Sequence, residues 1–150
     1  MSNEKSDIDI LLPILRKIPL FSTLDENLHR EIIKHIVLMY YPGDYELFSE
    51  GEDGDALYII KNGSVKIFHQ APEEGDLPIK IAEINDGGFF GEMALISDLP
   101  RNASAIATID SEIFILSKDD FKALLESNIA LAEQISATVV ERTNDNLNAK

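Results

Sequence analysis

Residues 89–104 read FFGEMALISDLPRNAS and lie between two segments typical of β-strands. Within this stretch, 91–95 can form one helical turn, whose first N–H groups lack partners in the turn and can face an anion. Arg101 follows Pro100, and its planar guanidinium matches the oxygens of a phosphate two at a time. Gly87 and Gly88, just upstream, allow the backbone to turn sharply and approach a ligand. The stretch predicts a pocket that binds a phosphate without cleaving it.

The pattern resembles the phosphate-binding cassette of cyclic-nucleotide-binding domains, which places the 91–95 and 100–104 segments at the same spacing. The resemblance implies that Glu92 binds the ribose 2′-hydroxyl and that Arg101 holds the exocyclic phosphate. It also implies a backbone frame around the ligand. The implied binding residues are Phe90, Gly91, Glu92, Met93, Ala94, Arg101, Asn102 and Ala103. The cyclic nucleotide is a ligand in this interpretation, and no cofactor is expected.

Three further positions are weaker candidates for the same ligand. Ile81 lies on a predicted strand, and Thr143 and Asn144 would cap the purine from the last helix, unless they form a solvated helix end. Asn102 stands where relatives of this family carry Ala, Ser or Thr, at a position that helps to distinguish cAMP from cGMP. We expect cAMP to be favoured over cGMP.

The two charged residues of the cassette also have simpler explanations. Arg101 can be a solvated or ion-paired surface side chain, and Glu92 can complement the dipole at the start of a helix. A third alternative pairs Glu92 with Arg101 in the empty pocket, where losing either partner would leave a costly unpaired charge. The cassette context favours ligand binding over these alternatives.

The whole-chain composition limits the partners. The 150 residues suit one domain, 45% of them are hydrophobic, and the formal net charge is −14. Such a surface disfavours binding to nucleic acid or to an anionic membrane, because both depend on Lys and Arg. The sequence contains no cysteine, no apolar run long enough to span a bilayer and no leader segment. These features predict a cytoplasmic protein without disulfides.

The middle of the chain predicts a mostly β fold. Its segments rich in β-branched and aromatic residues, separated by turn residues, are 37–41, 45–48, 56–60, 65–70, 79–84, 103–109 and 112–117. Asn62-Gly63 predicts a hairpin with a type I′ turn. Many short strands at this spacing indicate either a barrel or a double-sheet jelly roll. The resemblance implies a β jelly roll, or double-stranded β-helix barrel, flanked by helices.

Helices are predicted on both sides of the strands in sequence. Residues 8–17 form a short helix containing Pro13, and 24–36 carry an apolar stripe of three to four turns that Ser22 or Thr23 would cap. After the strands, helices start near 118 and 128, like the B and C helices of the family. The predicted single domain 1–150 is thus divided into 1–36, 37–117 and 118–147. The last helix, with Ile129, Ala132, Ile135 and Val139, either mediates a homodimer, contacts an unidentified protein partner or packs on its own barrel.

Other chemistries fit less well. His29 and His35 are not at the i, i+4 spacing of a helical metal pair, and the acidic segment 50–55 lacks the ligand pattern of a calcium loop, so no metal site is expected. We expect no catalysis. The preferred function is a signal-sensing regulatory module. The alternatives are the sensory domain of a catabolite-activator-type transcription regulator without its DNA-binding part, and a degenerate scaffold that does not bind ligand.

Overall fold

The computed structural model describes residues 6–71 and 73–148, with side chains as far as Val140. The chain separates into two compact units. The β unit comprises Ile36–Lys118, and the helical unit comprises Met1–His35 with Asp119–Lys150. The predicted strand region 37–117 thus has nearly the same limits as the β unit.

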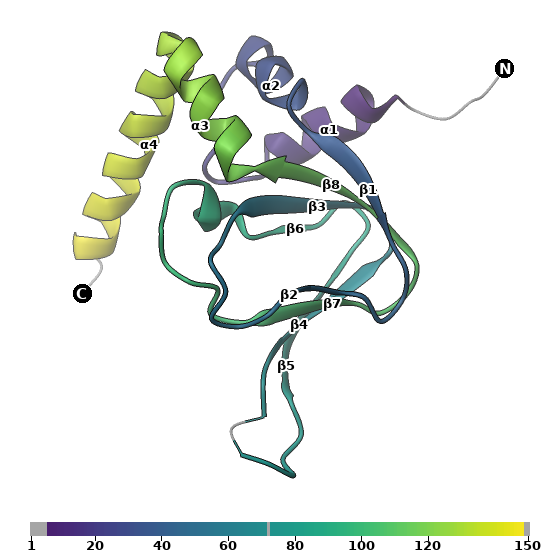
Figure 1. The fold of residues 1–150 in the computed structure, drawn as a ribbon. Helices are drawn as coiled ribbons and strands as arrows, with labels where there is room; N and C mark the ends of the chain where they lie inside the picture. The colour runs from purple at the N-terminus through teal and green to yellow at the C-terminus, as the bar shows by residue number, and fades with distance from the viewer. Residues whose placement is uncertain (1–5, 72, 149–150) are drawn as a thin grey trace, which may run out of the picture. The chain divides into compact units, whose positions relative to one another are not determined.

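The β unit is built from two antiparallel four-stranded sheets that face each other (Figure 1). One sheet has the order β1-β8-β3-β6 and the other the order β2-β7-β4-β5. The strands are β1 (Val37–Tyr41), β2 (Glu46–Phe48), β3 (Ala56–Asn62), β4 (Ser64–His69), β5 (Ile79–Asn85), β6 (Phe89–Phe90), β7 (Ser104–Ala107) and β8 (Ser111–Ser117). The predicted fold class, a β jelly roll with helices before and after it in the chain, is confirmed.

The core of the β unit comes from the inner faces of the two sheets. Alternation along each strand directs every second side chain inward, which is how two facing sheets enclose one core. The buried cluster is Phe48, Ala56, Tyr58, Ile60, Val65, Ala105 and Ile113. Burying a large apolar side chain of this kind stabilises the fold by about 1.5–3 kcal/mol. This core holds the starts of β3 and β7 in fixed positions, and the loops that precede them carry part of the candidate site.

The predicted hairpin at Asn62-Gly63 is wrong. β3 and β4 belong to different sheets, so the turn carries the chain across the roll instead of pairing its two strands. A type I′ turn needs positive φ at both central residues, whereas among the described non-glycine residues positive φ occurs at Asp44. Gly63 has φ 140°, and the position requires glycine because a Cβ there would lie 2.1 Å from the Oγ of Ser111. A local turn signal cannot report such a contact from β8.

The helical unit contains α1 (Asp7–Leu15) and α2 (Glu26–Ile33) before the β unit, and α4 (Ile129–Asn148) after it. α3 (Lys118–Ser127) starts at the last residue of the β unit. The prediction of a long helix over 24–36 is wrong in its limits. Asp25, instead of Ser22 or Thr23, caps α2 by accepting a hydrogen bond from the N–H of Leu28 at 2.9 Å. A carboxylate is a strong cap.

The helices pack through a small apolar core of their own. Phe21 and Phe121 lie with ring centroids 5.8 Å apart, and Thr23 is hydrogen-bonded to Thr138 at 3.1 Å. Among the α4 residues whose side chains are described, Leu131, Ile135 and Thr138 are buried, whereas the predicted seam residue Ile129 is exposed. Among the described residues, no helix is long and apolar enough to cross a membrane.

Candidate anion-binding site

The turn after β6 forms the floor of the candidate site. Gly91 adopts a left-handed conformation with φ 82°, and Glu92–Leu95 then form one turn of 3-10 helix (η1). The N–H of Ala94 donates to the carbonyl of Gly91 at 3.1 Å. The amides at the start of such a turn have no partner within it. The helical turn predicted from the sequence is therefore present, in the tighter 3-10 form.

Arg101 is held in place through its backbone. Its N–H donates to the carbonyl of Glu52 at 2.7 Å, and its own carbonyl accepts from the N–H of Gly51 at 2.8 Å. These two bonds pair the start of β7 with the loop between β2 and β3, which contains Gly51 and Gly54. The side chain consequently enters the β unit instead of extending into solvent, and its relative exposure is 9%.

The guanidinium of Arg101 lies in a mixed apolar and polar environment. Its Nη2 donates to the carbonyl of Ala56 at 3.0 Å and lies 3.6 Å from the Oδ1 of Asp55. Its Cζ is 4.1 Å from the ring centroid of Phe48 and 5.7 Å from that of Tyr58. Cation–π contacts of this kind are attractive where water is excluded. They fix the plane of the guanidinium.

The electrostatics of the site are those of a buried cation with unused donor capacity. The Nε of Arg101 is buried and makes no hydrogen bond. Burial lowers the pKa of Arg101, but a guanidinium titrates so far above neutrality that it stays charged. Burial, with the nearby Asp55 carboxylate as a smaller cause, raises the pKa of Tyr58 to about 12. The nearby Asp55 carboxylate is itself exposed, so solvent weakens its compensation of the Arg101 charge.

A hollow of about 460 Å³ opens beside Arg101. Its lining residues are Gly54, Gly91, Glu92, Met93, Ala94, Ser97, Leu99, Pro100, Arg101 and Asn102. Glycine is required at position 91, because a Cβ there would lie 2.8 Å from the Nη1 of Arg101 and 3.0 Å from the carbonyl oxygen of Ala56. The cation of Arg101 and a turn of backbone amides thus lie beside the same hollow, whose volume suits a small-molecule ligand.

The structure divides the sequence-predicted residues into two groups. Those that line the hollow are Gly91, Glu92, Met93, Ala94, Arg101 and Asn102. Phe90 and Ala103 do not line it: Phe90 stacks on Tyr58 at 5.1 Å, and Ala103 is buried. Ile81 lies half-exposed on β5 and is not part of the lining. Thr143 and Asn144 fall within α4, where their side chains lie outside the described residues.

Sequence reasoning missed the residues that surround the guanidinium from the other strands. The Oδ1 of Asp55 lies 3.6 Å from the Nη2 of Arg101, and Asp55 was not among the partners considered from the sequence. From the sequence, the acidic segment 50–55, which contains Asp55, was considered only as a possible calcium loop. Phe48 and Tyr58 gave no signal, because strand residues of this kind are expected in any β core. Their role depends on β2 and β3 lying next to the start of β7.

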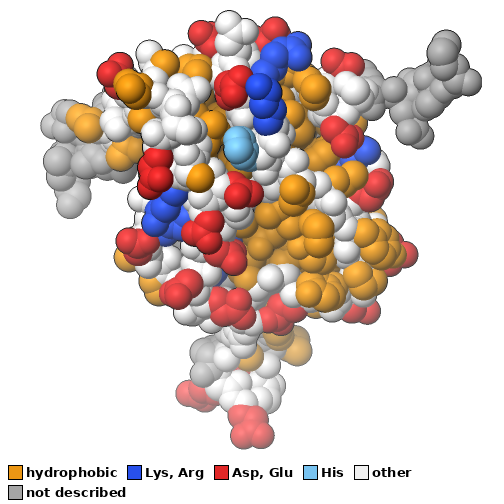
Figure 2. All heavy atoms as spheres, turned by 45° about the horizontal axis from the view of Figure 1, so that its top comes forward, with side chains coloured by type: hydrophobic (Ala, Val, Ile, Leu, Met, Phe, Trp, Pro, Cys, Tyr) orange, Lys and Arg blue, Asp and Glu red, His pale blue; other side chains and the backbone are white. Residues whose placement is uncertain are grey.

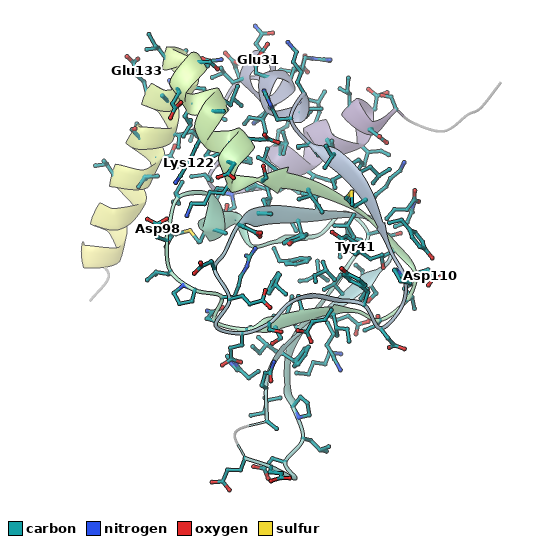
Figure 3. All side chains as sticks on the ribbon, viewed as in Figure 1. Glu31, Tyr41, Asp98, Asp110, Lys122 and Glu133 are labelled. Carbon is teal, nitrogen blue, oxygen red and sulfur yellow. The ribbon has the colours of Figure 1, made fainter. Side chains whose placement is uncertain are left out.

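The loop after η1 is anchored by Lys118, the first residue of α3. Its Nζ donates to the carbonyl of Ser97 and to the Oδ1 of Asp98, both at 2.6 Å, and the side chain of Asp98 is labelled in Figure 3. The N–H of Lys118 donates to the carbonyl of Asp55 at 2.8 Å. One residue thus connects both sides of the hollow with the start of a helix.

The geometry agrees with a comparison with known families. The model of the cyclic nucleotide-binding domain matches residues 38–128, which is more than half of the chain. The chain belongs to the cyclic nucleotide-binding domain family. The matched segment contains the whole hollow beside Arg101, together with Lys118 and α3.

Three relatives illustrate the range of this family. The chain is 35% identical over 111 residues to a cAMP-dependent protein kinase regulatory subunit of Aspergillus fumigatus, covering 74% of this chain and 26% of that protein. The N-terminal domain of a transcriptional regulator from Streptomyces coelicolor is similar with a TM-score of 0.79 and 26% identity, covering 91% of this chain and 96% of the other.

The regulatory domain of Toxoplasma gondii PKA, solved with cAMP, is similar with a TM-score of 0.69 and 28% identity, covering 81% of this chain and 46% of the other. The chain therefore spans about a quarter of the length of the kinase regulatory subunit that it matches.

Proposed function

We propose that this chain binds a cyclic nucleotide in the hollow beside Arg101 and acts as a non-catalytic, signal-sensing regulatory module. One observation carries the proposal. The guanidinium of Arg101 is buried beside a hollow of about 460 Å³, and its Nε has no hydrogen-bond partner. A buried polar group without a partner costs free energy, and a bound phosphate would supply that partner. Membership of the family and the cAMP named with the Toxoplasma relative support the same ligand class.

The roles of the individual residues follow from their positions. Arg101 binds the exocyclic phosphate through its guanidinium, and the backbone of Gly91, Met93 and Ala94 frames the same group. Glu92, on the same turn and in the lining, accepts a hydrogen bond from the ribose 2′-hydroxyl. Asn102 lies exposed at the rim of the hollow, where it contacts the nucleotide.

We propose a preference for cAMP over cGMP. Asn102 can hydrogen-bond either a phosphate oxygen or a guanine amino group, so its replacement tests which contact is made. The variant Asn102→Ala should lower the affinity for both nucleotides equally if the contact is to phosphate. A selective loss of cGMP affinity would instead assign Asn102 to the base.

Occupancy reaches the helices through the anchor at Lys118. A phosphate that draws the η1 turn inward also moves Ser97 and Asp98, both of which Lys118 holds at the start of α3. The ligand shifts this equilibrium only by the difference between its affinities for the two arrangements. α4 then presents a changed face, with the exposed Ile129 and Val140, to a second copy or another protein. We propose that the module acts in the cytoplasm.

A second candidate is the sensory part of a transcription regulator. The likeness to the N-terminal domain of the Streptomyces regulator favours it. In that case the DNA would be contacted by a segment outside these 150 residues, because a formal net charge of −14 disfavours binding to a duplex. The ligand site would be the same in both candidates.

Both candidate functions require that the chain binds a cyclic nucleotide beside Arg101. Calorimetric titration with cAMP and cGMP tests this requirement. Arg101→Ala should weaken binding by about 2–4 kcal/mol, since it removes one partner of a desolvated charge-assisted contact. Arg30→Ala is the matched control, because Arg30 is exposed and pairs with Glu26 on α2. If neither nucleotide gives a heat of binding, the chain is a scaffold domain that does not bind ligand. If wild type and Arg101→Ala bind with equal affinity, Arg101 does not hold the phosphate.

A further inference from the structure

β1 lies at the end of its sheet and pairs with β8. An edge strand directs half of its N–H and C=O groups away from its neighbour, and natural proteins usually protect such an edge with Lys, Pro or a bulge. The sequence of β1 is Val-Leu-Met-Tyr-Tyr, and its pairing with β8 runs without a break in register. This edge is therefore open to another strand.

The side chains of β1 are unusually exposed for a strand of apolar residues. The relative exposures are 53% for Val37, 46% for Met39 and 60% for Tyr40, with Leu38 also exposed. Hydrophobic side chains gather on the surface in Figure 2, with Asp and Glu side chains around them. Contiguous exposed apolar surface of this kind marks interaction sites in soluble domains.

A hollow of about 420 Å³ lies on the paired side of β1, next to β8 and the end of β3. Its lining residues are Leu38, Met39, Tyr40, Asn62, Asp110, Ser111 and Glu112. Asp110 accepts a hydrogen bond from the N–H of Gly43, and Glu112 accepts one from the Nδ2 of Asn62, both at 2.9 Å. Both donors are neutral, so these contacts position the two carboxylates without compensating their charge.

The register gives the two faces of β1 different chemistry. Met39 lies opposite Ile113, which belongs to the buried core, so this face is apolar. Tyr40 lies opposite Glu112, so the other face combines an aromatic ring with a carboxylate. Figure 3 shows Asp110 on the outer side of the strands and Tyr41 directed toward the interior of the roll.

We propose that the β1 edge binds an extended peptide of a partner protein as an added strand, with apolar side chains on one face and Lys or Arg on the other. The backbone of the peptide pairs with the free edge of β1, as in recognition by strand addition. Its apolar side chains lie beside Met39. Its cations reach Asp110 and Glu112 and stack on the ring of Tyr40.

Charge excludes a second copy of this chain as the preferred occupant. Two β1 edges brought together would juxtapose the carboxylates of Asp110 and Glu112 from both molecules, and each chain carries a formal net charge of −14. Like-charge contacts across an interface are unfavourable. A basic peptide removes this repulsion. This inference does not depend on nucleotide binding.

Fluorescence anisotropy with the full 150-residue chain tests the proposal. The probe is a short fluorescein-labelled peptide in which valine and lysine alternate. Comparison probes replace lysine by glutamate or place a proline at the centre, which removes a backbone donor. We expect saturable binding of the first probe alone. Asp110→Asn combined with Glu112→Gln should weaken it roughly fivefold at low salt.

The matched control is Glu73→Gln combined with Glu74→Gln, which removes two exposed carboxylates from the loop between β4 and β5 and should change the affinity less than about twofold. Hydrogen exchange should slow at the amides of β1 when the probe is bound. Equal effects of the two double variants, absence of binding, or unchanged exchange in β1 would overturn the proposal. A wild-type dimer that Met39→Lys dissociates would also overturn it in favour of a second copy.

Discussion

The two hollows of the β unit have similar volumes, about 460 and 420 Å³, and opposite electrostatics. The hollow beside Arg101 contains a buried cation and lies against a turn of backbone amides. The hollow along β1 is lined by exposed apolar side chains and by the carboxylates of Asp110 and Glu112. Both are formed by loops or edges of the same pair of sheets.

The difference lies in how each charge is held. The guanidinium of Arg101 is desolvated, so a phosphate bound there would meet a strong and directional partner. The carboxylates beside β1 face solvent, and each attracts a cation only weakly. The first hollow is therefore suited to a small anion bound through few contacts, and the second to an extended partner bound through many.

The largest effect should follow from Arg101→Met, which keeps the apolar contacts with Phe48 and Tyr58 and removes the charge. Cyclic-nucleotide affinity should fall by about 2–4 kcal/mol. The free energy of unfolding of the empty protein should change by less than about 1 kcal/mol, because the lost hydrogen bond to Ala56 is offset by the removed desolvation cost. Calorimetry and urea unfolding measure the two quantities. A large loss of stability would show that Arg101 is chiefly structural.

Gly91→Ala should destabilise the fold by roughly 2–3 kcal/mol, because the left-handed backbone at φ 82° and the approach of Arg101 both oppose a Cβ. Gly87→Ala is the matched control, since its φ is 80° and nothing lies within 4 Å of the added atom. It should cost about 1 kcal/mol. The difference between the two variants in urea unfolding isolates the steric part, and equal losses would show that the space beside Arg101 is not tight.

Alkaline pH should lower the free energy of unfolding, because Tyr58 lies in the core next to the hollow beside Arg101. The folded-state pKa of Tyr58 is about 12, above its ordinary value of about 10, so the fold favours the protonated phenol. This stability is present below pH 10 and is lost as the pH rises toward 12. Wild type should lose about 2 kcal/mol more than Tyr58→Phe by pH 11.5. Parallel losses in urea unfolding at pH 9 and 11.5 would contradict the assignment.

The smallest effect concerns the β1 edge without any peptide. Asp110→Asn with Glu112→Gln should change the free energy of unfolding by less than about 1 kcal/mol, because the neutral side chains retain oxygens that can accept from Gly43 and Asn62. Thermal unfolding measures this change. A loss above about 2 kcal/mol would indicate that these carboxylates stabilise the roll itself and would weaken their assignment to a partner.

Much of the fold followed from local patterns. Alternating β-branched and aromatic residues located β1 and β8, and Asn128, whose Oδ1 accepts from the N–H of Leu131 at 3.0 Å, lies where the last helix was expected to begin. The turn at Asn62-Gly63 was misread, because a dipeptide does not reveal which strands its flanks will pair with. The cap of α2 was misplaced because several adjacent residues were acceptable caps.

The sequence alone determined the roll and the family, and it predicts the cassette with Gly91, Glu92 and Arg101, since fixed residue types at fixed spacing report local backbone geometry. Only the tertiary structure decided what surrounds the guanidinium. Phe48, Asp55 and Tyr58 come from segments distant from Arg101 in the chain, and their contacts exist because two sheets close over one core. The exposure of the β1 edge was likewise decided by the order of the strands in the sheet, because the apolar sequence of β1 would suit a central strand equally well.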